Sequence, residues 1–529
     1  MKARSQGLLR RRVYAPVALL WVLLVPAGVM AQEVQLNVIE RSLRNGMKVL
    51  MVERHDKPTV SLYLQFKVGG VDDPKGRSGI AHLLEHMMFK GTKTYGTTNY
   101  KAEVPIMEQI DKIYAELEAE LAQADSPSEQ MDADKVRRLQ EQMHSLQTEQ
   151  ENYVVTDELW QTYQRLGGVG LNASTGDDST QYFVSLPSNQ LEVWAMLEAD
   201  RIANPVFREF YPERDVVHEE RRMRTDTSPE GKLWETFAAT AFLAHPYRNP
   251  VIGWASDIDR MRREEVLQYF KTFYAPNNCI AAIVGDIDPD KTLAILERYF
   301  GAIPAEPQPP RHITEEPEQQ GERRVVLKMD AQPQVYIAYH TPRLGSEDTF
   351  ALDALAQLLS GVTRGSRSGR LYKSLVLGKK VALAVDASSS TQLYPSLFVI
   401  TATPAQGKTA AEVEQAIYEE IERIQKEPPT DEEMTRVRNA ADASFIRSLR
   451  SDMGVARSIA YVEYIAGTWK YLLTEREKMK TVTPRQVQEV TKKYFGEENR
   501  TVGELQKTPS PEDGIEQESS ASSPSEARQ

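Results

Sequence analysis

Cysteine is almost absent from this chain of 529 residues, in which Cys279 is the only one. No intrachain disulfide can form, so a hydrophobic core must hold the fold together. The length exceeds what one ordinary core accommodates, and we expect two or more domains. Because a core of that size needs no covalent cross-link, the lack of disulfides does not argue against export.

Positive charge is also scarce, with 64 Lys and Arg residues against 76 Asp and Glu residues and a formal net charge of −12. This balance provides no basic patch for phosphate groups. It argues against nucleic acid as a partner and against attraction to an anionic membrane surface.

The first residues are basic and are followed by the apolar run VALLWVLLVPAGVM. Small residues at Val29 and Ala31 mark a cleavage point, so residues 1–31 are predicted to be a signal peptide. An uncleaved membrane anchor is the alternative, but the run is short for a bilayer, and no cysteine follows it for lipidation. We expect a periplasmic or secreted protein with no stable membrane anchor. Cleavage removes five positive charges, and the net charge falls from −12 to −17.

Two stretches of the chain share one order of predicted elements. Residues 60–90 contain an alternating β-rich run, a loop and an apolar helix, and residues 335–361 repeat that order. The ends agree as well, because residues 264–284 and 485–505 each predict a helix, an aromatic pair, an Asn and a strand. At one constant offset, Asn278 corresponds to Asn499 and Phe273 to Tyr494. We interpret this agreement as a duplicated α/β domain.

The duplication sets the predicted domain bounds. The first domain is expected to span residues 32–303 and the second residues 323–505. A Pro- and Glu-rich linker, residues 304–322, joins them. The polar, Ser/Pro-rich tail, residues 506–529, is expected to be disordered.

One segment interrupts the first copy. From about residue 104 to 153, apolar residues recur at helical spacing on both sides of the turn-like ADSPSEQMDAD. This pattern predicts an inserted helical hairpin. The hairpin could pack on its own domain or dock a partner, and the sequence leaves both roles open.

GIAHLLEHMMFKGT, residues 79–92, places His82 and His86 one helical turn apart, with Glu85 beside the second. Residues i and i+4 lie on one face of a helix, so the two imidazoles can point at one ion. Zinc suits imidazole and carboxylate ligands, and a hydrolytic site needs three protein ligands and an open position for water. The ion lowers the pKa of that water, and Glu85 can accept its proton as general base. Packed or surface histidines are the alternative, but only eight histidines occur in the chain.

The order H-x-x-E-H is the inverzincin motif, and with it the chain resembles the pitrilysin or insulin-degrading-enzyme (insulinase) family, which includes the mitochondrial processing peptidases. The resemblance continues through residues 167–183, ERDVVHEERR, HPYRNPVIGW and YAPNN, and it is strongest for bacterial members of half the length of pitrilysin. It implies clamshell zinc endopeptidases, with one Zn²⁺ per chain, that cut peptides and unfolded protein segments.

The resemblance also implies the third ligand, Glu220. Glu213 and Glu220 are two helical turns apart and share a face, whereas Glu219 and His218 point elsewhere. Glu213 is expected to hydrogen-bond to a ligand and orient it without binding the metal itself. The alternative is a solvated charged helix. The separation of His86 from Glu220 is longer than is usual in the family, and the inserted hairpin accounts for the difference.

GLNAST, residues 170–175, is expected to be an edge strand. In similar enzymes this strand pairs with the substrate backbone, a mode of binding that suits loose sequence preference. We place Asn172 and Ala173 beside the scissile bond, with a structural turn as the alternative. His245 and Tyr247 lie in a Pro-rich loop and receive no role beyond loop structure.

These observations predict an α+β fold with two homologous α/β domains, each an antiparallel-rich sheet packed with helices. The predicted function is an exported zinc metalloendopeptidase that hydrolyses peptide bonds of peptides or unfolded segments through a zinc-bound water, with Glu85 as general base. The competing hypothesis is a non-catalytic or zinc-binding subunit of a peptidase-like assembly. Such a subunit would be expected to lose a ligand or Glu85, and none of them is missing.

Related two-halved enzymes carry an Arg and a Tyr, seven residues apart, in the second half, where they would stabilise the developing oxyanion. The corresponding positions here are Val376 and Leu383, whose side chains cannot donate a hydrogen bond. Arg370 and Tyr372 are close by but have the wrong spacing. We therefore expect a heterodimer with a homologous subunit that lacks H-x-x-E-H and carries the pair. A homodimer without the pair is the alternative.

Overall fold

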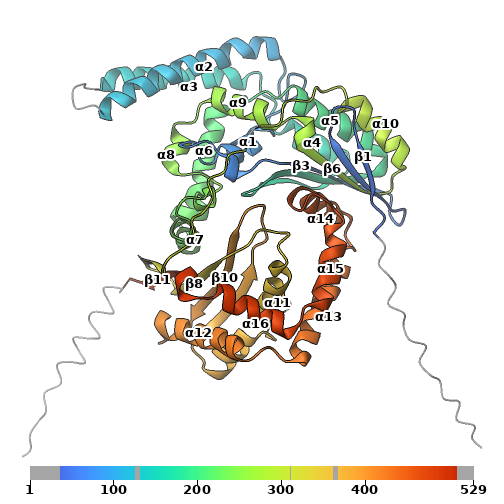
Figure 1. Ribbon diagram of the computed structural model, residues 1–529. Helices are drawn as coiled ribbons and strands as arrows, with labels where there is room; N and C mark the ends of the chain where they lie inside the picture. The colour runs from blue at the N-terminus through green and yellow to red at the C-terminus, as the bar shows by residue number, and fades with distance from the viewer. Residues whose placement is uncertain (1–35, 126–130, 310, 362–366, 509–529) are drawn as a thin grey trace, which may run out of the picture. The chain divides into compact units, whose positions relative to one another are not determined.

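Two mixed sheets organise the chain in the computed structural model, which describes residues 36–125, 131–309, 311–361 and 367–508 (Figure 1). The predicted signal peptide and the tail beyond residue 508 lie outside these ranges. Within them, every helix is too short or too polar to cross a bilayer. From Asn37 onward the chain belongs to one compact unit, which contains both sheets.

The two sheets share one topology. The first has the order β1-β2-β6-β3-β5-β4 and the second the order β7-β11-β8-β10-β9. The first sheet consists of β1 (Ile39–Ser42), β2 (Lys48–Glu53), β3 (Thr59–Phe66), β4 (Val169–Thr175), β5 (Thr180–Pro187) and β6 (Cys279–Gly285). The second consists of β7 (Arg323–Met329), β8 (Gln334–Thr341), β9 (Ala382–Ser389), β10 (Ser396–Pro404) and β11 (Arg500–Lys507).

Pairing senses agree as well as strand order. β2–β6 and β7–β11 are parallel, and every later pair in each sheet is antiparallel. The second sheet repeats the first from β2 onward, without a counterpart of β1. The predicted fold class, two homologous α/β domains, is confirmed.

The conserved position of an asparagine in both copies has a structural reason. Asn278 donates from Nδ2 to the carbonyl of Phe273, at the end of the helix before β6, and Asn499 donates in the same way to the carbonyl of Tyr494. Each amide therefore satisfies a carbonyl at a helix C-terminus, which has no partner within the helix. This repeated helix cap explains why Asn278 and Asn499 occupy corresponding positions in the two copies.

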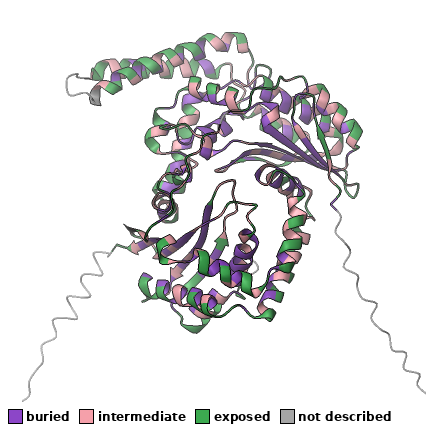
Figure 2. Cartoon of the chain, in the orientation of Figure 1, coloured by how far each residue is buried: buried purple, intermediate pink, exposed green. Residues whose placement is uncertain are grey.

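Burial follows the strand positions. All seven residues of the central strand β6 are buried, because β2 and β3 flank it and helices cover it. Strands of both sheets are largely buried in Figure 2. The first core includes residues of α1 (Ile80–Met87), α5 (Leu191–Ala203), α9 (Arg263–Phe273) and α10 (Pro289–Tyr299). Further helices of the described chain are α4 (Glu158–Arg165), α6 (Phe210–Arg221), α8 (Ala255–Asp259), α11 (Asp348–Ser360), α12 (Ala410–Lys426), α13 (Asp431–Ser448), α15 (Tyr471–Thr481) and α16 (Pro484–Tyr494).

The two halves exchange one helix each. α7 (Pro229–Ala241) follows α6 in the first half but packs on β7, β8 and β11 of the second sheet. α14 (Asp452–Ile465) belongs to the second half but packs on β3 and β6 of the first sheet. Arg54 pairs with Asp452 at 2.9 Å, and the guanidinium of Arg457 lies over the ring of Phe183. Each sheet thus has part of its apolar face covered by the other half.

The predicted hairpin consists of α2 (Tyr100–Leu121) and α3 (Ala133–Glu151), which lie side by side (Figure 1). Ile106, Ile110 and Tyr114 belong to the first core, so this part of α2 packs on its own domain. In the predicted linker, residues 304–322, the described residues form no helix or strand. It is nevertheless tied to the first half, because Arg311 pairs with Asp72 at 3.2 Å.

Candidate metal centre

The three predicted ligands converge from two helices. His82 and His86 project from α1 and Glu220 from the last turn of α6. Oε2 of Glu220 lies 3.2 Å from Nε2 of His86 and 3.7 Å from Nε2 of His82. Among the described residues, this is the one group of three or more His, Cys, Asp or Glu side chains close enough to hold a metal ion together.

The donor set fits zinc. A tetrahedral ion with bonds of about 2.0–2.1 Å requires its donor atoms to lie about 3.3 Å apart. The two separations from Glu220 bracket that value, and all three donor atoms lie within 4.8 Å of one another. Two imidazoles and one carboxylate are also the donors of hydrolytic zinc sites, in which a fourth position is left for water.

Glu213 holds one of the imidazoles. Its Oε1 accepts a hydrogen bond from Nδ1 of His86 at 2.8 Å, which leaves Nε2 to face Glu220. Burial would raise the pKa of Glu213, but its contacts with His86 and Lys90 lower it to about 2. Glu213 is therefore ionised and occupies the position predicted for a residue that orients a ligand.

The electrostatics of the site favour a cation between the histidines and Glu220. Burial would lower the pKa of His86, but hydrogen bonds with Glu213 and Glu220 outweigh it and raise this pKa to about 9. Burial and the neighbouring His86 lower the pKa of His82, so that this imidazole is neutral. A ligating imidazole must be neutral, so a metal ion at this centre would displace the proton that His86 holds between Glu213 and Glu220.

Glu85 lies on α1 with the two histidines, and a strand of the first sheet holds its carboxylate. Oγ1 of Thr175, at the end of β4, donates to Oε2 of Glu85 at 2.5 Å. Burial raises the pKa of Glu85. A raised pKa makes the carboxylate a better proton acceptor.

A cavity of about 310 Å³ opens beside this centre, with Glu85, His86 and Asn172 in its wall. Asn172 is exposed on β4, which pairs only with β5 among the described strands. The side chain of Ala173 is instead buried in the first core, so this residue can offer only its backbone to a ligand. A larger cavity of about 1090 Å³, lined from α5 and α9, contains none of the predicted site residues.

Sequence reasoning missed several residues of the centre. Thr175 carried no signal, because its contact with Glu85 depends on the packing of β4 against α1. Lys90, which pairs with Glu213 at 2.7 Å, lies four residues after His86 but in the loop that follows α1, so helical spacing did not indicate it. Arg224 pairs with the other oxygen of Glu220 at 2.7 Å.

The residues that sequence reasoning set aside lie elsewhere. His218 contacts Asp259 at 2.9 Å, away from the ligands. Glu219 is mostly exposed and pairs with Arg222. In the Pro-rich loop, Tyr247 donates a 2.6 Å hydrogen bond to Asp178, which follows β4, and His245 packs against the ring of Tyr247.

Comparison with known proteins decides the family. A model of the insulinase family (peptidase family M16) matches residues 48–133, and a model of the peptidase M16 inactive domain matches residues 260–441. Together they match about half of the chain. The chain belongs to the insulinase family. The predicted resemblance is thereby confirmed. Neither model covers residues 134–259, so within this insulinase-family chain the placement of Glu213 and Glu220 depends on the geometry described above.

Curated relatives carry zinc-protease names. The chain is 29% identical to the zinc protease PqqE of Helicobacter pylori over 422 residues, 78% of this chain and 81% of that one. It is 24% identical to an uncharacterized zinc protease of Mycobacterium leprae over 457 residues, 85% of this chain and 88% of that one.

Solved structures agree on the fold. A protease from Helicobacter pylori superposes with a TM-score of 0.74 at 26% identity and covers 89% of this chain and 100% of its own. The periplasmic protease PqqL from Escherichia coli gives a TM-score of 0.65 at 16% identity and covers 93% of this chain, which matches 50% of that longer protein.

Proposed function

We propose that this insulinase-family chain is an exported zinc metalloendopeptidase that cleaves peptides or unfolded protein segments. The observation that carries the proposal is the convergence of Nε2 of His82, Nε2 of His86 and Oε2 of Glu220, with Glu85 on the same helix as the histidines. The zinc-protease names of its relatives support it. For export, the support is the N-terminal sequence and the periplasmic location named for the Escherichia coli neighbour.

In this reaction each residue of the metal centre has a separate role. A zinc ion held by His82, His86 and Glu220 would supply Lewis acidity, which lowers the pKa of a water molecule and polarises the scissile carbonyl. Thr175 holds the carboxylate of Glu85 through Oε2, and this carboxylate takes the proton from the attacking water. The same carboxyl group then returns this proton to the leaving amine nitrogen as the C–N bond breaks.

Substrate backbone would pair with the open edge of β4. Main-chain pairing of this kind selects extended segments with little regard to side chains, and Asn172 and Ala173 lie on this strand. The cavity beside Glu85 and His86 would receive one substrate side chain. The requirement for an extended strand favours peptides and unfolded segments over folded proteins.

We further propose that the active assembly is a heterodimer with a homologous half-length subunit that supplies an Arg/Tyr pair. In this chain Val376 is partly buried against the second core, and Leu383 is 55% exposed but apolar. Arg370 is held by Glu433 through two hydrogen bonds of 2.8 and 2.7 Å. Tyr372 packs against the second core. Arg370 is engaged by Glu433, and Val376 and Leu383 cannot donate a hydrogen bond, which supports a donor from a partner.

Glu85→Gln is the test of the proposed reaction. The amide cannot accept the proton, so peptide cleavage should fall by ~10²–10⁴-fold or more, while fold and zinc content stay those of the wild type. Cleavage of an unstructured peptide is measured with and without a chelator, alongside metal analysis. The opposite result is a wild type that binds zinc but shows no chelator-sensitive cleavage, even when its partner is present. That result would favour the alternative of a zinc-binding, non-catalytic subunit.

A further inference from the structure

The base of the hairpin is joined to the loop that follows the metal-binding helix. Backbone hydrogen bonds link Thr98 to Tyr153 at 2.7 Å and Val155 to Gly96 at 3.1 Å, around an isolated bridge between Thr97 and Val154. The two legs of the hairpin are therefore closed together where the hairpin begins and ends.

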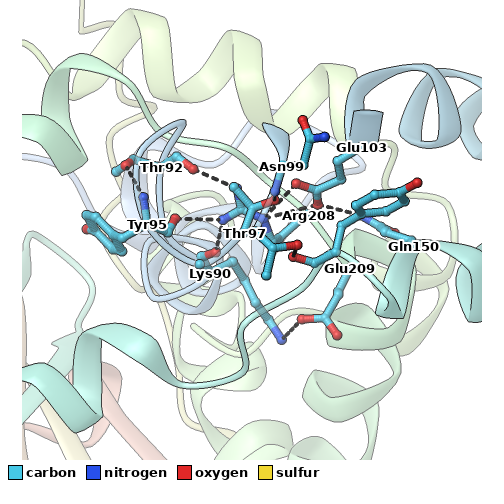
Figure 3. Close-up of polar contacts among 12 residues, drawn as sticks. Lys90, Thr92, Tyr95, Thr97, Asn99, Glu103, Gln150, Arg208 and Glu209 are labelled. Carbon is cyan, nitrogen blue, oxygen red and sulfur yellow. Dashed lines mark hydrogen bonds and ion pairs between the residues drawn. The ribbon is translucent and has the colours of Figure 1, made fainter. Parts of the chain in front are cut away.

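Arg208, two residues before α6, is the centre of this junction (Figure 3). Its Nε donates to Glu103 of α2 at 3.1 Å, and Gln150 of α3 donates to the same carboxylate at 2.9 Å. Both charged side chains are almost fully buried, at 1% and 0% exposure. Removing either partner would leave the other as an uncompensated buried charge, so this pair ties Arg208 firmly to the hairpin.

The guanidinium of Arg208 also holds the loop after α1. Its Nη atoms donate to three backbone carbonyls, those of Lys90, Thr92 and Tyr95. Gly91 and Gly96 have φ values of +94° and +81°, and a Cβ on either would lie within 2.7 Å of Nη1 of Arg208. The loop therefore closes tightly around the guanidinium, and glycine is required at both positions.

This loop contains Lys90, whose side chain reaches Glu213 beside the metal centre. Its Nζ lies 2.7 Å from Oε2 of Glu213 and 3.2 Å from Oε2 of Glu209. Glu213 accepts the hydrogen bond of His86 through its other oxygen. An unbroken set of contacts thus runs from the hairpin through Arg208, Lys90 and Glu213 to a predicted ligand.

The same junction shapes the cavity wall. Gly96 donates its backbone N–H to Glu158 of α4 at 2.5 Å, and Val154, Val155 and Trp160 line the cavity with Glu85 and His86. The chain that returns from the hairpin therefore forms one side of the space next to the predicted general base.

We propose that Lys90 is a positioning residue of the metal centre and that the inserted hairpin, through Arg208, holds Lys90 in place. This inference rests on the proposed zinc function and gives the hairpin a role within its own chain. Without Lys90, Glu213 loses its cation and the orientation of the His86 ring is no longer fixed. Outer contacts of this kind typically contribute 10–100-fold to metal affinity.

Lys90→Met removes the ammonium and keeps the length of the side chain. We expect zinc affinity, measured by competition with a chromophoric chelator, to fall about 10–100-fold. The absorption spectrum of the cobalt-substituted protein should also change, because the ring of His86 is held less firmly when Glu213 has lost its cation. Lys90→Arg should restore most of the affinity, since it keeps a charge between the two carboxylates.

Lys135→Met is the matched control. Lys135 pairs with Glu120 at the same 2.7 Å, but at the far end of the hairpin, and this substitution should leave zinc affinity unchanged. Arg208→Lys keeps the charge opposite Glu103 but cannot reach three carbonyls, and it should lower zinc affinity as Lys90→Met does. Should Arg208→Lys fail to fold, Lys90→Met with its control still decides the role of Lys90, and Gln150→Leu, which removes one hydrogen bond to Glu103, tests the link to the hairpin.

The outcomes separate this inference from the proposed function. If the wild type binds zinc and Lys90→Met has the same zinc affinity and cobalt spectrum, the inference is wrong and the proposed function still stands. Equal losses in Lys90→Met and Lys135→Met would do the same, because they would mean a general effect of charge removal. A wild-type chain that binds no zinc would overturn the proposed function and this inference with it.

Discussion

Nε2 of His86 lies 3.2 Å from Oε2 of Glu220, although the two residues belong to different helices and are separated by the whole hairpin and β4–β5. The contact closes the predicted ligand set. It also depends on α6, which continues through the π-helical segment Arg222–Asp226 into α7 and hence to the second sheet.

Glu220→Gln should therefore reduce zinc affinity by more than the 10–100-fold typical of groups that only orient a ligand. The amide is a neutral and weaker donor. Glu219→Gln provides the control, because its side chain is 62% exposed and pairs with Arg222. Metal analysis and chelator competition measure both. Stoichiometric zinc with unchanged affinity in Glu220→Gln would remove this residue from the ligand set.

Stability should depend on pH through Asp353 of α11. Burial, and then the neighbouring Glu475, raise the pKa of Asp353 from 3.8 to about 8. Between these values the folded state holds a proton that the unfolded state releases, so this group makes stability fall as pH rises from about 4 to 8. Asp353→Asn should stabilise the protein at pH 8, by at least the ~1.4 kcal/mol of one pKa unit, and have little effect at pH 4.

Asp348→Asn, on the same helix, should act with the opposite sign. Burial would raise the pKa of Asp348, but hydrogen bonds with Lys493 and Tyr494 lower it below 3.8. Its carboxylate contributes stability above that value, so the substitution should destabilise at pH 8 and lose its effect in acid. Chemical denaturation at both pH values measures each variant. Parallel pH curves for Asp353→Asn and the wild type would contradict the prediction.

Phe237→Ala should destabilise the chain by about 3–5 kcal/mol. The ring is fully buried where α7 packs on the second sheet, and a Cβ at Gly503 of β11 would lie 2.8 Å from it. Trp234→Ala on the same helix should cost much less, because this side chain is 46% exposed. Equal losses of stability, measured by denaturant unfolding, would mean that α7 does not depend on this apolar contact.

The isolated chain should be a weak peptidase that a partner activates. Its own Arg370 is engaged by Glu433, and Val376 and Leu383 cannot donate hydrogen bonds. Co-expression with a homologous half-length subunit that carries the Arg/Tyr pair should raise kcat strongly and yield a stable complex by size-exclusion chromatography. Full turnover by the isolated chain, unaffected by such a subunit, would contradict the proposed heterodimer.

The sequence by itself determined the parts of this protein that depend on local periodicity. His82, Glu85 and His86 share a face because they lie within one turn of a helix, and Glu213 and Glu220 share a face because two turns separate them. The duplication was also visible, since Asn278 and Asn499 cap corresponding helices, a local requirement repeated in each copy. The inserted hairpin was predicted from its apolar spacing for the same reason.

Only the tertiary structure decided how these parts meet. The approach of α6 to α1, the exchange of α7 and α14 between the sheets, and the burial of Ala173 depend on which apolar faces pack together. The contacts of Thr175 with Glu85 and of Arg208 with Glu103 join residues far apart in the chain. Periodicity specifies which face of an element is apolar, but the partner of that face is selected by the packing of the whole core, and no local pattern encodes it.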